Sequence, residues 1–578
     1  MSLKTLELKP DRLLMDSNFD GYKLSLDDLN VSKKTLEIPI DRTVLASSQY
    51  GLLHAKLFGL HNSLFGDRFD NFTSVYFVDQ QFKMQKIYVD PDTNQLVDPI
   101  EVFTIPKLRE RTKGDYNTTL CFASPAYAVC SDGMGTLLIL ATRDKKDDDT
   151  FELLYSEKVL DNQQGYVISD AMYNKDTSQL HVLLLNIEED ALNRFVSVIH
   201  WLTFKQEENV DGNKSWGQVA LRQLKTRGEV QYLHLEKNGD HIYVVSENNI
   251  EFVLNSEHPI QDEPSNNSEK IYQWSQNIEE ITVKVSLPKN AQKNLVKVLC
   301  ERSMLKVSYN DETLVSGELE GFIDASLMTW ELNAEQLLII ELHKVEGGPF
   351  WTELIKGDTR GTYVLDTCII DQANETLQKY TSENTEIPPT GTTFNSQQIE
   401  ECDFETDKSE IFDRISGVTN ETTHRIHLGS HQVILSPYIT SEWPPALGIR
   451  HDVDVCIWQP LLEGDNFTCK HEGTLLAFGY VQASKTNRKF VTCSPNLNYA
   501  VVSESAGHIF IYRQNRPLLS SELRHRSSGR RVKSMAQQQV FNLPNQEILG
   551  LFANNTHLFI LGENFVISLS INGPEPTE

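Results

Sequence analysis

The chain has no continuous apolar stretch of about 18 residues, so the sequence predicts no membrane-spanning helix. Its first ten residues also lack the uninterrupted apolar run of a secretory signal. Eight cysteines lie singly along the 578 residues, without a Cys-x-x-Cys pair, which argues against a zinc ribbon and against a disulfide scaffold. These absences predict a protein of the reducing cytoplasm and nucleus.

Positive charge is in short supply. There are 53 Lys and Arg residues against 81 Asp and Glu, which gives a formal net charge of −28. Such a charge favours solubility and disfavours non-specific binding to nucleic acid or to an anionic membrane. The sequence therefore predicts protein partners, without direct nucleic-acid contact.

Catalytic signatures are missing as well, since the chain has neither a phosphate-binding Gly-x-x-x-x-Gly-Lys loop nor a Gly-x-Ser-x-Gly elbow. In a strand, the spacing of His424 and His427 puts the two rings on opposite faces, where they cannot share a metal ion. Asp132–Gly135 and His451–Asp454 are typical of hairpin turns, in which Asp binds backbone amides and Gly supplies positive φ. We expect no enzyme, no catalytic or metal-binding residue and no cofactor.

What the chain does contain is a set of short strands between Tyr272 and Leu354. Apolar and polar residues alternate from Ile281 to Leu287, and this period of two predicts a small antiparallel sandwich. Its aromatic anchors come in a fixed order, with Trp274 early, Trp330 before the last long strand and Trp351 after it.

That order of anchors resembles the CS domain, and within that group the version found in the NudC family. The resemblance covers about 85 residues. It implies a non-enzymatic co-chaperone that associates with the ninety-kilodalton heat-shock chaperone system and with client proteins, including β-propellers. The first 60 residues lack the heptads of the founding member's coiled coil, so its dimerisation is not carried over and a monomer is expected.

Strand–turn–strand units recur about every 50–60 residues on both sides of this stretch. Residues 127–139 are similar to 499–511, and residues 241–253 to 557–567. Such repetition predicts an all-β chain whose flanks form a seven-bladed β-propeller, with the CS-type sandwich inserted between blades. N-terminal material such as 36–40 or 22–26 would close the last blade. Two separate β-sandwiches are the alternative.

Composition shifts predict the domain boundaries, because residues 255–270 and the acidic run 400–407 are typical of exposed linkers. The predicted parts are a propeller part with about four blades (1–260), the CS-like domain (271–357), an acidic connector (358–425) and a propeller part with about three blades (426–573).

Candidate partner-binding residues come from two places. Trp351 follows the last strand of the CS-like stretch beside two glycines, where we expect partial exposure. A basic loop interrupts the acidic background between Arg513 and Lys533, and Arg524, Arg526, Arg530 and Arg531 are its candidates for docking an acidic protein surface. A plain solvated loop is the alternative.

These observations support two hypotheses of function. In the first, the chain is an adaptor co-chaperone that binds chaperone and client proteins through its CS-like domain and its propeller. In the second, the propeller is a scaffold subunit of a stable trafficking or RNA-processing complex, and the CS-like domain is a structural insert.

Overall fold

The computed structural model describes residues 3–571 with internal gaps. The gaps are residues 143–149, 161–163, 191–193, 209–213, 261–271, 278, 288–290, 311, 333–336, 346–350, 352, 357, 359, 364–409, 465, 506, 518–523, 525–528, 530 and 533. The chain divides into two compact units, of which one is Met1–Ile260 with Glu401–Glu578 and the other is Gln261–Glu400.

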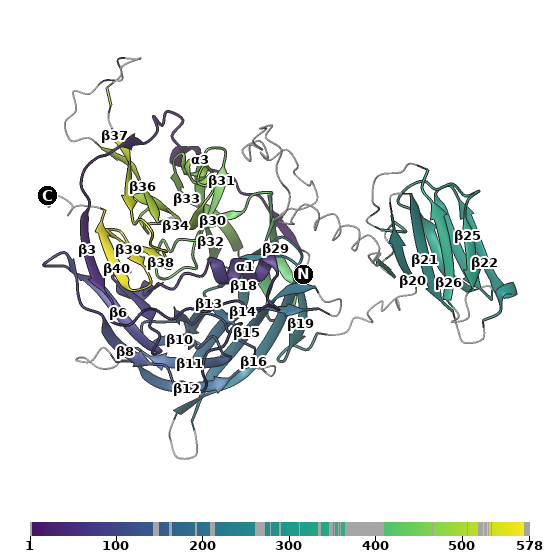
Figure 1. The fold of residues 1–578 in the computed structure, drawn as a ribbon, viewed down its shortest axis with the longest axis horizontal. Coiled ribbons are helices and arrows are strands. Elements are labelled where there is room, and N and C mark those ends of the chain that lie inside the picture. The colour runs from purple at the N-terminus through teal and green to yellow at the C-terminus, as the bar shows by residue number, and fades with distance from the viewer. Residues whose placement is uncertain are drawn as a thin grey trace, which may run out of the picture. The chain divides into compact units, whose positions relative to one another are not determined.

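The first unit is a ring of seven sheets, and each sheet is one blade of a propeller (Figure 1). We number the blades in the chain order of their innermost strands. The prediction of an all-β, seven-bladed propeller is confirmed.

The first three blades follow one another along the chain. Their strands are β4 (Phe65–Gly66), β5 (Ser74–Val78), β6 (Lys83–Asp90), β7 (Gln95–Leu96) and β8 (Ile100–Thr104) in blade 1; β9 (Thr119–Phe122), β10 (Tyr127–Ser131), β11 (Thr136–Ala141) and β12 (Glu152–Lys158) in blade 2; β13 (Val167–Asn174), β14 (Gln179–Glu189), β15 (Phe195–Glu208), β16 (Lys214–Thr226) and β19 (Glu251–Asn255) in blade 3.

In three of the other four blades an N-terminal strand forms the outer edge. Blade 5 consists of consecutive strands. The strands of these four blades are β17 (Val230–Leu235), β18 (His241–Ser246), β28 (Glu410–Ser416), β29 (Thr422–Gly429) and β1 (Lys4–Leu6) in blade 4; β30 (Val433–Leu435), β31 (Leu447–His451), β32 (Asp454–Glu463) and β33 (Asn466–Leu475) in blade 5; β34 (Arg488–Cys493), β35 (Tyr499–Glu504), β36 (His508–Pro517), β37 (Ser534–Asn542) and β2 (Lys23–Leu24) in blade 6; β38 (Gly550–Ala553), β39 (His557–Leu561), β40 (Phe565–Ser570) and β3 (Asn30–Thr35) in blade 7.

Burial explains why the pattern of apolar residues in the blade strands differs from that in the CS-like strands. All five residues of β5 are buried, and so are the first five of β11, because neighbouring blades cover both faces of these sheets. Strands buried on both faces are continuous apolar runs, whereas a two-sheet sandwich buries every second residue. In β26 (Leu337–His343) of the second unit, the buried residues do alternate.

The N-terminal segment runs along the outer edges of four blades. β1 pairs in parallel with β29, Asp11 N donates to His471 Nδ1 at 2.9 Å, and β2 pairs in parallel with β37. β3 then pairs antiparallel with β40 and completes the last blade. N-terminal material therefore closes the ring, but the closing strand is Asn30–Thr35, between the two segments suggested by the sequence.

The inserted unit interrupts blade 4 rather than following it. After β18 the chain forms β19, which pairs with β16 of blade 3, and the third strand of blade 4 is β28, beyond the insertion. The prediction of an insertion between blades is therefore wrong in this detail. Residues 241–253 form no hairpin either, although they resemble the β39–β40 hairpin, because β28 takes the place beside β18.

A buried ion pair holds β28, the strand that follows the insertion, in blade 4. Glu236 Oε2 accepts a hydrogen bond from Arg414 Nε on β28 at 2.6 Å, and both side chains are buried. Burial by itself would raise the pKa of Glu236, but hydrogen bonds from His241 and Arg414 lower it to about 2. β28, the strand that follows the insertion, is thereby joined to the turn between β17 and β18.

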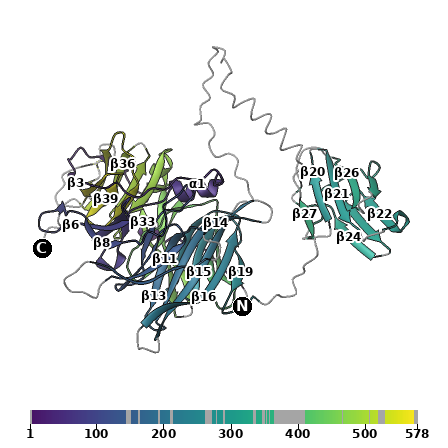
Figure 2. The same ribbon diagram turned by 60° about the horizontal axis from the view of Figure 1, so that its bottom comes forward.

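The second unit is a sandwich of two sheets. One sheet has the order β25-β26-β21-β20-β27 and the other β22-β23-β24. The strands are β20 (Tyr272–Gln276), β21 (Glu280–Ser286), β22 (Val296–Glu301), β23 (Met304–Tyr309), β24 (Glu312–Glu318), β25 (Thr329–Leu332), β26 (Leu337–His343) and β27 (Gly361–Tyr363). Figure 2 shows β27 beside β20 at the margin of the sandwich.

The predicted connector, residues 358–425, therefore contains structure at both ends. β27 belongs to the sandwich, while β28 and the start of β29 belong to blade 4. Acidic and polar composition hid these strands, because a short edge strand and a strand that carries a buried ion pair need few apolar residues. The sequence also predicts a short helix near residues 373–380, which lie outside the described part of the chain.

Within the described residues, the helices are few and short. They are α1 (Leu52–Gly59), α3 (Phe478–Ala483) and the 3-10 turns η1 (Arg12–Leu14), η2 (Arg68–Asp70) and η3 (Lys293–Leu295). Figure 1 shows α1 near the middle of the ring, where the inner strands of the blades face one another.

Candidate protein-interaction sites

Trp351 is enclosed in the sandwich. Only 8% of its surface is exposed, and a Cβ at Gly321 would come within 2.8 Å of the indole ring, so glycine is needed there. Gln276 holds the backbone of Trp351 on both sides, since Oε1 accepts from Trp351 N at 2.8 Å and Nε2 donates to Trp351 O at 2.7 Å. The expectation that Trp351 is partly exposed is therefore wrong, and its role as a partner-binding residue stays a prediction.

Lys344 is part of the same arrangement. Its Nζ donates to Gln276 Oε1 at 2.8 Å and to Asn277 O at 3.0 Å, and lies 5.9 Å from the centre of the Trp351 ring. Removal from water lowers the pKa of this buried amine. Lys344, Gln276 and Trp351 together connect the segment after β26 to β20, the first strand of the sandwich.

Exposed apolar side chains gather at another part of the sandwich. Phe322 is 56% exposed, and the guanidinium of Arg302 lies 5.0 Å from the centre of its ring. Val345 is 46% exposed, and its N–H donates to Phe322 O at 3.0 Å. Trp330, by contrast, is half-buried and packs against the core of the sandwich, with Lys293 Nζ 5.2 Å from its ring centre. Apolar groups left in water beside a cation are typical of protein-binding surfaces.

The basic tract of the sequence splits into a structural and an exposed part. Arg513 is buried, and its Nη2 donates to Ile571 O at 2.8 Å, so it supports blade 6. Arg524 and Arg531 are exposed and form an isolated antiparallel β-bridge with each other. Arg526 and Arg530 lie outside the described residues. The docking role of the four arginines stays a prediction.

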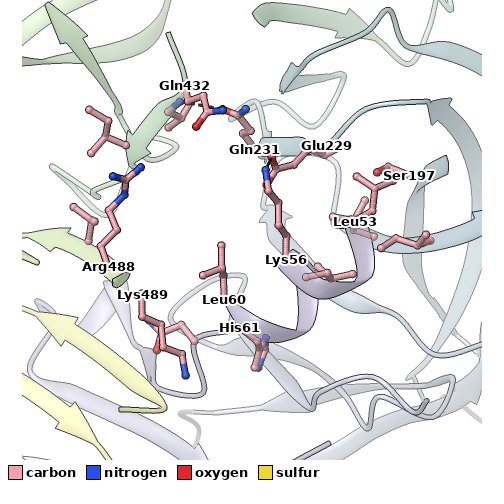
Figure 3. Close-up of a pocket in the computed structure, with 18 of the residues that line it drawn as sticks. Leu53, Lys56, Leu60, His61, Ser197, Glu229, Gln231, Gln432, Arg488 and Lys489 are labelled. Atoms are coloured by element: carbon pink, nitrogen blue, oxygen red, sulfur yellow. Dashed lines mark hydrogen bonds and ion pairs between the residues drawn. The ribbon is translucent and has the colours of Figure 1, made fainter. Parts of the chain in front are cut away.

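A cavity of about 730 Å³ opens in the middle of the ring (Figure 3). Its walls come from α1 and from the innermost strands β17, β30 and β34. The apolar lining residues include Leu53, Leu57, Leu60, Val230, Val433, Ile434 and Val491. A second hollow of about 480 Å³ adjoins it, and Lys56, Leu60, Arg488 and Lys489 line both.

Charged groups stand at the rim of this cavity. Lys56 Nζ pairs with Glu229 Oε2 at 2.5 Å, and Lys489 Nζ pairs with Glu547 at 3.1 Å. Arg488 is exposed and makes no ion pair or side-chain hydrogen bond with the described residues. Figure 3 shows Arg488 on the opposite side of the cavity from Glu229 and Lys56.

A buried arginine on the turn η2 of blade 1 connects strand β13 of blade 3 with the loop that follows β30 of blade 5. Arg68 Nη2 donates to Ala171 O at 3.1 Å, and Arg68 Nη1 donates to Tyr438 Oη at 3.1 Å and lies 4.0 Å from Asp170 Oδ1. All its partners come from other blades or the loops that follow them. We therefore assign Arg68 a structural role.

Polar residues that suggested chemistry in the sequence have structural roles. His424 is buried and His427 exposed, which confirms that they lie on opposite faces of β29. Asp454 Oδ1 accepts from Ala477 N at 2.5 Å, and Asp132 Oδ1 accepts from Met134 N at 2.7 Å within its turn. In the part of the chain that the structure describes, no three His, Cys, Asp or Glu residues form a metal-binding group.

Sequence reasoning missed the cavity, because Lys56, Glu229 and Arg488 are far apart in the chain and belong to no motif. No helix within the described ranges is both long and apolar enough to cross a membrane.

The CS unit and the whole chain both have relatives among known proteins. The family model "CS domain" matches residues 270–344. The NudC domain-containing protein 1 of Xenopus tropicalis is 32% identical, over 98% of this chain and 99% of its own length. The mouse (Mus musculus) protein of the same name is 30% identical, over 99% and 100%. The crystal structure of Sqt1 from Chaetomium thermophilum matches with 12% identity and a TM-score of 0.32, covering 89% of this chain and 97% of its own.

Proposed function

Because the chain belongs to the family of NudC domain-containing protein 1, we propose that it is a non-enzymatic co-chaperone and adaptor. In this proposal the CS domain binds client proteins and the heat-shock chaperone system, and the propeller selects partners. The protein would act in the cytoplasm and nucleus as a monomer.

The observation that supports this proposal most directly is the apolar surface on the CS unit. Phe322, Val345 and Arg302 are joined by short contacts at one place, and the two apolar side chains are about half exposed. Exposed aromatic and aliphatic groups beside a cation can bind the apolar segments that a non-native client presents. The buried contacts of Trp351 with Gln276 and Lys344 would stabilise the conformation of this surface without touching the client.

The test is quantitative affinity purification from cells with the full-length protein and with the double variant Phe322→Ser, Val345→Ser. We expect chaperones and a broad set of newly made proteins to be lost, at least about fivefold, because the apolar contact is removed while the fold is kept. The matched control is Val418→Ser, which removes a 48% exposed valine from the propeller.

The same experiment distinguishes the scaffold alternative. If one fixed set of partners persists in both variants and no chaperone depends on Phe322 and Val345, the propeller is the working part and the co-chaperone proposal fails. Circular dichroism of each purified variant establishes that a loss of partners does not reflect unfolding.

A further inference from the structure

The cavity in the middle of the ring differs from the rest of the molecule in the sign of its charge. The chain carries a net charge of −28, but three basic and only two acidic side chains line the cavity and the adjoining hollow. Both acids are already neutralised, since Glu229 pairs with Lys56 and Glu547 pairs with Lys489 and with Arg42. Arg488 is therefore a cation in excess at the rim.

The polar groups around Arg488 leave it available to a ligand. Gln231 is occupied, since its Oε1 accepts from Val433 N at 3.0 Å and its Nε2 donates to Glu410 at 3.0 Å. Gln432 is exposed at the rim between Gln231 and Arg488 (Figure 3). A guanidinium in this position can form two parallel hydrogen bonds to a carboxylate.

The apolar part of the site is provided by α1. Leu53, Leu57 and Leu60 line the cavity. Exposed apolar side chains stand at both ends of this helix, since Leu52 at its start is 71% exposed and Leu60 directly after its end is 50% exposed. Contiguous apolar surface that leads into a hollow is typical of protein docking sites, whereas small ligands are enclosed on most sides.

We propose that this cavity is a docking site for a segment of a partner protein that presents a carboxylate next to a large apolar side chain. Arg488 binds the carboxylate, and the apolar side chain rests on Leu57 of α1 and on Leu60, the residue directly after the helix. The site rests on the proposed role of the propeller in partner selection and deepens it; it uses no residue of the CS unit, so it can fail or hold independently of chaperone binding.

The experiment uses the full chain and a phage-displayed random peptide library. We expect the enriched peptides to share an Asp or Glu within about two positions of Leu, Ile, Phe or Trp. One enriched peptide is then synthesised with a fluorophore, and its Kd is measured by anisotropy. We expect Arg488→Glu to weaken binding at least about tenfold, because it removes a charge-assisted contact and introduces repulsion.

Two matched measurements make the test specific. Arg12→Glu, a charge reversal at an exposed arginine on η1, should leave the Kd within about twofold. Exchange of the peptide's carboxylate for the amide should cost about as much as Arg488→Glu, and the affinity should fall as salt is added. Binding that is indifferent to Arg488→Glu overturns the proposal, and so does a selection that enriches no acidic–apolar peptide.

Discussion

At the scale of single residues, the type of a side chain does not reveal whether it binds a partner or supports the fold. Trp351 belongs to a segment rich in glycine, yet it is 8% exposed because Gln276 and Gly321 leave room for its backbone and ring. Arg513 and Arg524 lie in one basic tract, but only Arg513 is buried and bonded to the end of blade 7. The surroundings decide the role in each case.

Two buried histidines are expected to lower the free energy of unfolding of this protein in acid. His181 and His200 lie in blade 3, each 4% exposed, and burial lowers the pKa of each to about 4. The unfolded value is about 6.5, so the free energy of unfolding is unaffected above that pH and falls as the pH drops towards 4.

We expect His200→Gln to reduce this pH dependence. Between pH 7 and pH 5, protonation of His200 in the unfolded state costs about 2 kcal/mol of stability, and a glutamine does not titrate. The measurement is urea unfolding at both pH values for the wild type, for His200→Gln and for the exposed-site control His427→Gln. An equal pH-dependent loss in all three proteins would contradict the assignment.

At the scale of elements, the N-terminal segment contributes unequally to the blades. β1 has three residues, all of them at least partly exposed, and adds to an edge that β29 already forms. β3 pairs along six residues with β40 and leads into Leu36 and Ile40, which are buried in the core of blade 7 and its neighbour. β3 therefore matters more for ring closure than β1.

Truncations separate these contributions. Removal of residues 1–8 deletes β1 and should lower the free energy of unfolding by no more than about 2 kcal/mol, since little apolar surface is lost. Removal of residues 1–36 deletes the outer strand of blade 7 and should yield protein without a cooperative transition. Thermal unfolding followed by circular dichroism checks both, and equal midpoints for the two truncations would show that β3 does not close the ring.

At the scale of the whole molecule, the insertion leaves and re-enters the ring at opposite ends of one strand. Asn255 Nδ2 donates to Gly417 O at 2.8 Å, just beyond the end of β28, whereas the chain returns at Glu410, where β28 begins. Seven residues of strand separate these points, about 20 Å at ~3.3 Å per residue. In the sandwich, by contrast, Tyr272 and Gly361 are partners in a parallel pair.

This separation predicts how the ring tolerates removal of residues 261–409, which joins Ile260 to Glu410 through a linker. A Gly/Ser linker of about 16 residues has a root-mean-square span of roughly 22 Å, so the ring should fold with it. With a two-residue linker, four residues separate His258, whose O accepts from Asn420 Nδ2, from Glu410; extended they reach roughly 17 Å, which falls short and should strain or unfold blade 4. Near-ultraviolet circular dichroism and the thermal midpoint measure this, and the two deletions behaving alike would contradict the topology.

The sequence by itself determined the elements whose signal is local. Alternation and anchor order identified the CS-like sandwich, and recurring hairpins predicted seven blades, because side-chain periodicity depends on which face of a strand is buried. Hairpins such as β10–β11 and β35–β36 were found this way. Turn residues such as Asp132 were likewise recognised from their neighbours.

Only the tertiary structure decided what depends on pairing between distant segments. β19 resembles a hairpin partner of β18 but pairs with β16, and β28 reaches its place from beyond the insertion. The cavity assembles Lys56, Glu229 and Arg488 from separate parts of the chain. The physical reason is that strand pairing uses backbone groups common to all residues, so ring closure, and not the local sequence, selects each partner.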